Sequence, residues 1–175
     1  MKFAADPPIT SAFPRHGAGG RGNYGGRQDL PHFFTIIPEH NLIYVRYSGV
    51  VTIEDYVRVV EGVTAHPGFS IEHKHLVDLT HLKRVKREYF KIMLMQARIA
   101  EWVARARAEI LSVMVAPTPE AMATAKMVLR SWERLDTPVV RRVIPAMEQA
   151  ASLLGLEDAT LRRILDDIDR VAPLD

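Results

Sequence analysis

The chain has 175 residues, 47% of them hydrophobic, which is enough for one domain with its own core plus extensions. Its formal net charge of +2 gives no general drive toward nucleic acid, and cysteine is absent, which excludes disulfides, thiolate metal sites and a cysteine nucleophile. No apolar run reaches the roughly 18 residues of a membrane span, and no secretory signal opens the chain, so we expect a cytoplasmic protein.

Residues 1–32 read as a tail, with six of the ten glycines and four of the eleven prolines. Few apolar side chains are available there to offset the entropy lost on ordering, so we expect a flexible extension. The alternative is an arm that orders on a partner. Its contacts would be Arg15, Arg21, Tyr24 and Arg27.

Two β-rich runs, at 33–38 and 42–47, are separated by three polar residues and predict a hairpin. Thr52 and Asp55 resemble a capping box, so a helix is expected to begin there. Its end is predicted at the His-Pro-Gly sequence of 66–68.

Leu76–Leu79 is almost continuously apolar, which is typical of a central strand. A polar turn and the longest helix, at about 86–107, are expected to follow. The apolar surface of that helix is wider than one sheet face needs. Part of it should therefore meet another helix or a second subunit in a homo-oligomer.

The remaining elements are a strand at 110–115, a helix capped by Thr118 and a last strand at 139–144. A short helix then ends at Gly155. A final helix at about 158–171 has a clean apolar stripe. Since no strand follows it, this helix must dock on the domain or cover a partner.

The order β-β-α-β-α-β-α-β-α plus one helix predicts an α/β fold with a single, mostly parallel sheet behind an N-terminal hairpin. LVDLTHLKRV, followed directly by a helix, resembles the central segment of STAS domains, which have the anti-sigma-factor antagonist (SpoIIAA-like) fold. The wider pattern, with FTIIPEHNLIYVRYSGVVTIEDY and VVRRVIPAMEQAASLLGL, resembles uncharacterised bacterial STAS-like proteins, whose fold is similar to that of the CRAL-TRIO lipid-transfer proteins. The resemblance implies a STAS-like domain at 33–156, between the tail and a C-terminal helix at 157–175.

STAS domains that act as phosphorylation switches have a serine at the start of the long helix. Here that position falls at 86–89, Lys-Arg-Glu-Tyr, where neither Ser nor Thr occurs. The resemblance therefore does not bring the switch with it. Thr80, in the preceding turn, is the substitute that remains.

Lys83, Arg84, Lys86 and Arg87 gather before the long helix and are a candidate site for a phosphate or an acidic partner. The alternative is a solvated basic turn offset by nearby carboxylates.

Three histidines, His73, His75 and His81, fall within nine residues, with Asp78 close in sequence. A metal site needs three or four converging ligands. The spacing does not establish this convergence, so we expect surface and core-edge histidines and no metal.

No serine lies in a nucleophile-elbow pattern, and no phosphate-loop or dinucleotide glycine pattern occurs in the folded part. The leading expectation is a non-enzymatic STAS-like regulatory or scaffold module that binds a protein partner and uses no cofactor. The alternative is a carrier of an apolar or lipid-like small molecule, with the Met and Trp side chains of the helices lining its pocket. The alternative for these Met and Trp side chains is ordinary packing in the hydrophobic core.

Overall fold

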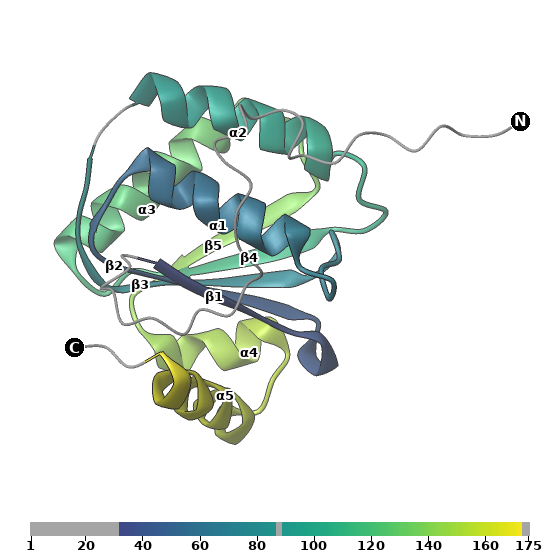
Figure 1. Ribbon diagram of the computed structural model, residues 1–175, viewed down its shortest axis with the longest axis vertical. Coiled ribbons are helices and arrows are strands. Elements are labelled where there is room, and N and C mark those ends of the chain that lie inside the picture. Colours follow the sequence, from purple (N-terminus) through teal and green to yellow (C-terminus); the bar gives the residue numbers. More distant parts are fainter. Residues whose placement is uncertain (1–31, 87–88, 173–175) are drawn as a thin grey trace, which may run out of the picture.

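The computed structural model describes residues 32–86 and 89–172, which form one five-stranded sheet with helices on both faces (Figure 1). The sheet order follows the chain: β1 (His32–Ile37), β2 (Leu42–Val51), β3 (Lys74–Val85), β4 (Ile110–Val115) and β5 (Val139–Ile144). β1 and β2 form an antiparallel hairpin, and β2 to β5 are parallel. The predicted α/β class and mixed sheet are confirmed.

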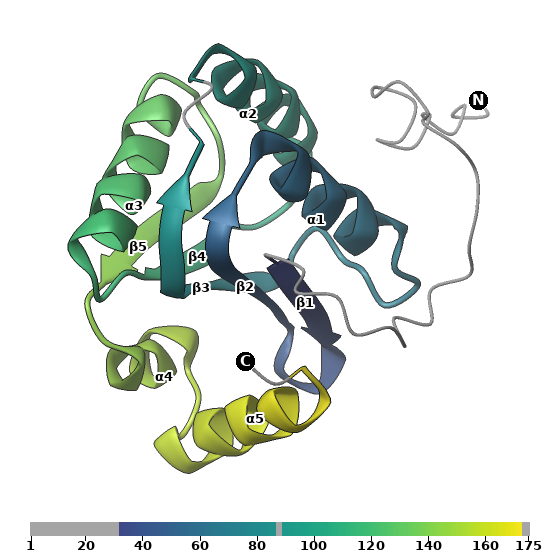
Figure 2. The same ribbon diagram turned by 60° about the vertical axis from the view of Figure 1, so that its left-hand side comes forward.

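Three helices connect the parallel strands, and two follow β5. They are α1 (Ile53–Ala65), α2 (Tyr89–Val103), α3 (Pro119–Trp132), α4 (Ala150–Leu154) and α5 (Asp158–Val171), with short 3-10 helices η2 (Pro38–His40) and η3 (Met147–Gln149). Each crossover steps to the next strand in the same direction, and right-handed crossovers of this kind place their helices on one face. Figures 1 and 2 show α1, α2 and α3 over one face, and α4 and α5 over the other.

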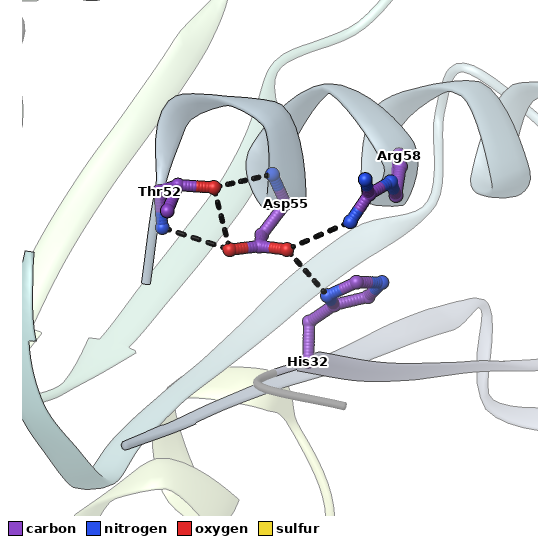
Figure 3. Close-up of polar contacts among 4 residues, drawn as sticks. All are labelled: His32, Thr52, Asp55 and Arg58. Carbon is purple, nitrogen blue, oxygen red and sulfur yellow. Dashed lines mark hydrogen bonds and ion pairs between the residues drawn. The ribbon is translucent and has the colours of Figure 1, made fainter. Parts of the chain in front are cut away.

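The start of α1 is held by the predicted capping box, which is confirmed (Figure 3). The Thr52 backbone N–H and hydroxyl both donate to Asp55 Oδ2, at 2.8 and 2.7 Å. The Asp55 N–H in turn donates to Thr52 Oγ1 at 3.2 Å. Arg58 donates to the other carboxylate oxygen at 3.1 Å, and His32 Nδ1 lies 3.7 Å from it. This box fixes the helix that borders β1, where Gly62 lets the Phe34 ring lie against the helix backbone.

α5 docks on the domain, one of the two outcomes that its apolar stripe predicted. Leu161 and Ile168 are buried with α4 and the sheet in a core that includes Leu42 and Leu76. The apolar stripe was expected to continue to Val171, at the end of the helix, but Val171 is 76% exposed, so the buried part of the stripe ends before it.

A buried arginine secures the far end of α5. Arg46, only 4% exposed on β2, donates to Asp169 Oδ1 at 2.6 Å and to the Ala172 carbonyl oxygen. Its guanidinium also lies 5.7 Å from the centre of the Phe33 ring. The two hydrogen bonds join residues more than 120 positions apart in the chain.

β3 is longer than predicted and replaces the expected polar turn. It continues to Val85, so Lys83 and Arg84 are strand residues, and α2 begins at Tyr89 rather than at about 86. The cause is the neighbouring strand: β2 also continues, and Val51 pairs with Val85. Leu82 is buried while Lys83 and Arg84 point to solvent, so one side of this extension belongs to the core and the other is polar.

Candidate functional site: an apolar cavity with a polar row

A cavity of about 610 Å³ lies between the sheet and the three helices α1, α2 and α3. Its floor is formed by the side chains of β2 to β5 that face these helices, among them Val45, Val77 and Met114. Ile53 and Val59 of α1 contribute to one wall. Most of the lining is aliphatic or aromatic, which is the lining usual for small-molecule sites of this size.

Three polar side chains interrupt this apolar floor in a single row across the sheet. His75 of β3 is paired in register with Ser112 of β4, and Ser112 is paired with Arg141 of β5. All three line the cavity. Paired positions on adjacent strands lie roughly 5 Å apart. Ile43 ends the row on β2, so the polar part of the floor is at the β5 side of the cavity.

Arg141 places a positive charge in this cavity. Its Cζ atom lies over the Trp132 ring, 3.7 Å from the ring centre, and Nη1 donates to the Val139 carbonyl oxygen at 3.1 Å. Burial lowers the pKa of Arg141 to about 10, and the nearby Tyr56 partly opposes that shift. Among the described residues, no carboxylate forms an ion pair with Arg141. In the described part of the chain, the contacts of this guanidinium are with the Trp132 ring and the Val139 carbonyl oxygen, while the exposed Glu101 and Arg105 line the same cavity.

His75 is neutral at pH 7. Burial lowers its pKa to about 4, and the positive charge of Arg141 contributes in the same direction. A neutral imidazole offers one N–H donor and one acceptor nitrogen. Ser112 beside it is 8% exposed. The row thus combines one cation with two neutral hydrogen-bonding groups.

Another polar group comes from α2, which covers the cavity on the side opposite the sheet. Gln96 is 2% exposed and lines the cavity, and its Oε1 has no hydrogen-bond partner within the described part of the chain. An unsatisfied buried carbonyl costs about 1–3 kcal/mol. The cavity lining therefore includes a partly buried cation and, within the described residues, a buried acceptor without a hydrogen-bond partner.

The predicted basic site lies elsewhere. Lys83, Arg84 and Lys86 are exposed at the end of β3, and Arg84, Lys86 and Glu120 border a small surface depression. The Lys86 N–H donates to the Val51 carbonyl oxygen, which closes the β3 extension. Arg87, the fourth member of the predicted cluster, lies outside the described residues.

The three histidines do not converge. His73 precedes β3, where its Nδ1 lies 2.9 Å from the Ser70 backbone nitrogen and 3.0 Å from the Ser70 carbonyl oxygen, while His81 is exposed. Asp78 accepts from the Tyr44 hydroxyl at 2.8 Å. In residues 32–86 and 89–172, no group of three or more histidine, aspartate or glutamate side chains is arranged to hold a metal ion.

Thr80 lies within β3 rather than in a turn, and its N–H donates to Asp78 Oδ1 at 2.8 Å. It is partly buried at the point where the register of β2 and β3 shifts. The four contacts predicted for the tail, Arg15, Arg21, Tyr24 and Arg27, lie outside the described residues.

The fold defines the chain as an α/β protein with a five-stranded mixed sheet. No protein-family model, no curated protein and no solved structure matches it. None of the helices described by the structure combines the length and apolar character needed to cross a membrane. The function must therefore be inferred from the cavity and its side chains.

The sequence pattern did not predict the polar row. From the sequence, His75 was a candidate metal ligand, Ser112 was one of the serines without a nucleophile-elbow pattern, and Arg141 was not a candidate. The available signal was a polar residue near the start of each of the three strands, but β3 also begins with Lys74 and β5 has two adjacent arginines. Pairing these positions requires the strand register, which a single sequence does not provide.

Proposed function

We propose that this chain binds an apolar small molecule in the cavity between the sheet and α1–α3. The observation that supports this best is the volume of about 610 Å³ with a predominantly apolar lining. Protein interiors are otherwise close-packed, and an unfilled apolar volume lowers stability. Cavities of roughly 300–1,000 Å³ with a few polar groups are the usual form of ligand sites.

We propose a binding rather than a catalytic role. Ser112 and His75 are neighbours in the row, but no hydrogen bond joins their side chains within the described residues. No described carboxylate bonds His75 to orient it for proton transfer, as a nucleophilic mechanism would require. A carrier or a ligand-responsive module uses the cavity without such groups.

A neutral fluorescent probe, N-phenylnaphthylamine, tests this function directly. The wild-type protein should bind it with stoichiometry near one and with enhanced fluorescence. Val77→Trp fills the cavity from its floor and should abolish the binding. Val50→Trp is the matched control, because Val50 lies on the adjacent strand, is 41% exposed and is not part of the cavity lining.

A second variant guards against a folding defect. Thr124→Phe narrows the cavity from α3 and leaves the sheet unchanged. Thermal melts should show both filled variants folded. If folded Val77→Trp and Thr124→Phe proteins bind the probe as the wild type does, the cavity is not the binding site and the proposal is wrong.

A second candidate is the STAS-like module that binds a protein partner. We propose that the fold is STAS-like because the sequence resembles STAS domains. The exposed Lys83, Arg84 and Lys86 at the end of β3 favour an acidic surface on the partner. Replacing Lys83 and Lys86 with Gln should weaken capture of that partner at low salt, with little change in melting temperature. If the double variant captures the partner as the wild type does at both low and high salt, these basic residues are not the partner-binding surface.

A further inference from the structure

The positive charge of Arg141 favours a ligand that carries a negative charge. It enters the floor of an apolar cavity from β5, between the Trp132 ring and the rest of the polar row. A guanidinium has five N–H donors, and the described contacts use only one of them, from Nη1 to the Val139 carbonyl oxygen. Arg141 is partly buried, and a partly desolvated cation without an anionic partner is stabilised by a ligand that supplies the anion.

The neighbours of Arg141 are suited to the same head group. Ser112 is adjacent in register and its hydroxyl can donate, as can the N–H of the neutral His75 one strand further. A carboxylate has two oxygens and about four acceptor positions, so it can accept from all three side chains. Val45, Val77 and Met114 of the floor offer only apolar contact.

We propose that the ligand is an amphipathic carboxylate: an anionic head bound by Arg141, Ser112 and His75, and an apolar body lying along the sheet beneath α1–α3. This inference rests on the proposed function and adds the chemical class of the ligand to it. A hydroxyl or amide group on the body would find an acceptor in Gln96 Oε1. The cavity would then hold both ends of one molecule.

A head-group series tests the assignment. Dodecanoate, dodecanol and dodecyltrimethylammonium share one apolar body, and each is measured by displacement of N-phenylnaphthylamine from the full chain. The wild type should bind dodecanoate most tightly and the cation most weakly. Acetate, which has the head without the body, should displace no probe at the same concentration. Displacement by acetate as strong as by dodecanoate would show a site for small free anions and overturn the proposal.

Variants of β5 locate the charge. Arg141→Gln should weaken dodecanoate by about 10- to 100-fold, the range expected for hydrogen bonds to a charged group, and should leave dodecanol nearly unchanged. Arg141→Lys should restore part of the loss. Arg142→Gln is the control, because Arg142 is the next residue of the same strand and is exposed. It should bind all three ligands as the wild type does.

Ser112→Ala keeps the test decisive if Arg141→Gln does not fold. It should weaken dodecanoate by about two- to tenfold, as expected for one neutral hydrogen bond, and should spare dodecanol. Equal affinity of wild-type protein for dodecanoate and dodecanol, unaffected by Arg141→Gln and Ser112→Ala, would overturn the head-group assignment alone. Failure of every ligand, including the neutral probe, would instead contradict the proposed function.

Discussion

The carboxylate of Asp55 should be the main support of the N-terminus of α1, the helix that forms one wall of the cavity. Replacing it with Asn leaves one accepting oxygen in place of two and removes the charge from a side chain that is 7% exposed. The Thr52 N–H and hydroxyl would lose a charge-assisted partner, at 2.8 and 2.7 Å. Hydrogen bonds to a charged group contribute about 1.5–3 kcal/mol. The Arg58 pair adds little, because that arginine is 62% exposed.

We therefore expect Asp55→Asn to lower the free energy of unfolding by about 1–3 kcal/mol, measured by urea denaturation at pH 7. Glu54→Gln is the matched control. Glu54 is the adjacent residue in the same first turn, and its contact with Lys91 joins two side chains that are both more than half exposed. Both changes remove one negative charge near the N-terminus of the helix dipole. The difference between their effects on the free energy of unfolding therefore measures the contribution of the capping box.

The pH dependence of the free energy of unfolding tests whether the ionised Asp55 carboxylate causes this stabilisation. Burial alone would raise the pKa of Asp55, but the hydrogen bonds from Thr52 and the nearby His32 and Arg58 outweigh it and hold the pKa below the ordinary value of 3.8. The stabilisation is therefore complete above about pH 4 and is lost as the pH falls through the lower, folded-state pKa. The gap between the wild type and Asp55→Asn should close in that range. A cost no larger than that of Glu54→Gln at pH 7 would refute the reasoning.

Three further changes should have separable effects. Deleting 157–175 uncovers the apolar surface beneath α5 and should reduce solubility or change the oligomeric state; an unchanged melting temperature and size would contradict the docking. Arg46→Met should destabilise by about 1–3 kcal/mol and speed amide exchange in α5, whereas Arg170→Met, exposed at 73%, should do neither. The pKa of His75 is near 6.5 in the unfolded chain and about 4 in the folded chain, so the free energy of unfolding should fall by at most roughly 3 kcal/mol as the pH drops from 6.5 to 4. Urea denaturation at a series of pH values should show a smaller fall for His75→Gln. The exposed His81→Gln variant should show the same fall as the wild type.

Much of the fold was accessible from the sequence because local signals agreed with one another. The strands at 110–115 and 139–144 and the helix at 158–171 lie where their apolar patterns predicted them. The caps at Thr52 and Thr118 and the left-handed Gly155, with φ of 68°, are also as expected. Each of these features depends on residues within a few positions of one another.

The errors arose where distant residues decide the outcome. The end of β3 is polar on one side, and only pairing with the extended β2 keeps it a strand. Arg141 and Arg142 are adjacent and follow two valines, so the pattern does not indicate which arginine faces the helices. That choice, the cross-strand row and the cavity depend on register and on the packing of helices over the sheet.

The most direct test of the ligand site is a titration of the full chain with dodecanoate, followed by its two-dimensional amide NMR spectrum. We predict that the largest shift changes occur at His75, Ser112, Arg141 and the floor residues around Val77. Residues of α4 and α5 on the opposite face should change little. Shift changes confined to that opposite face or to the exposed end of β3, with the polar row unaffected, would contradict the account.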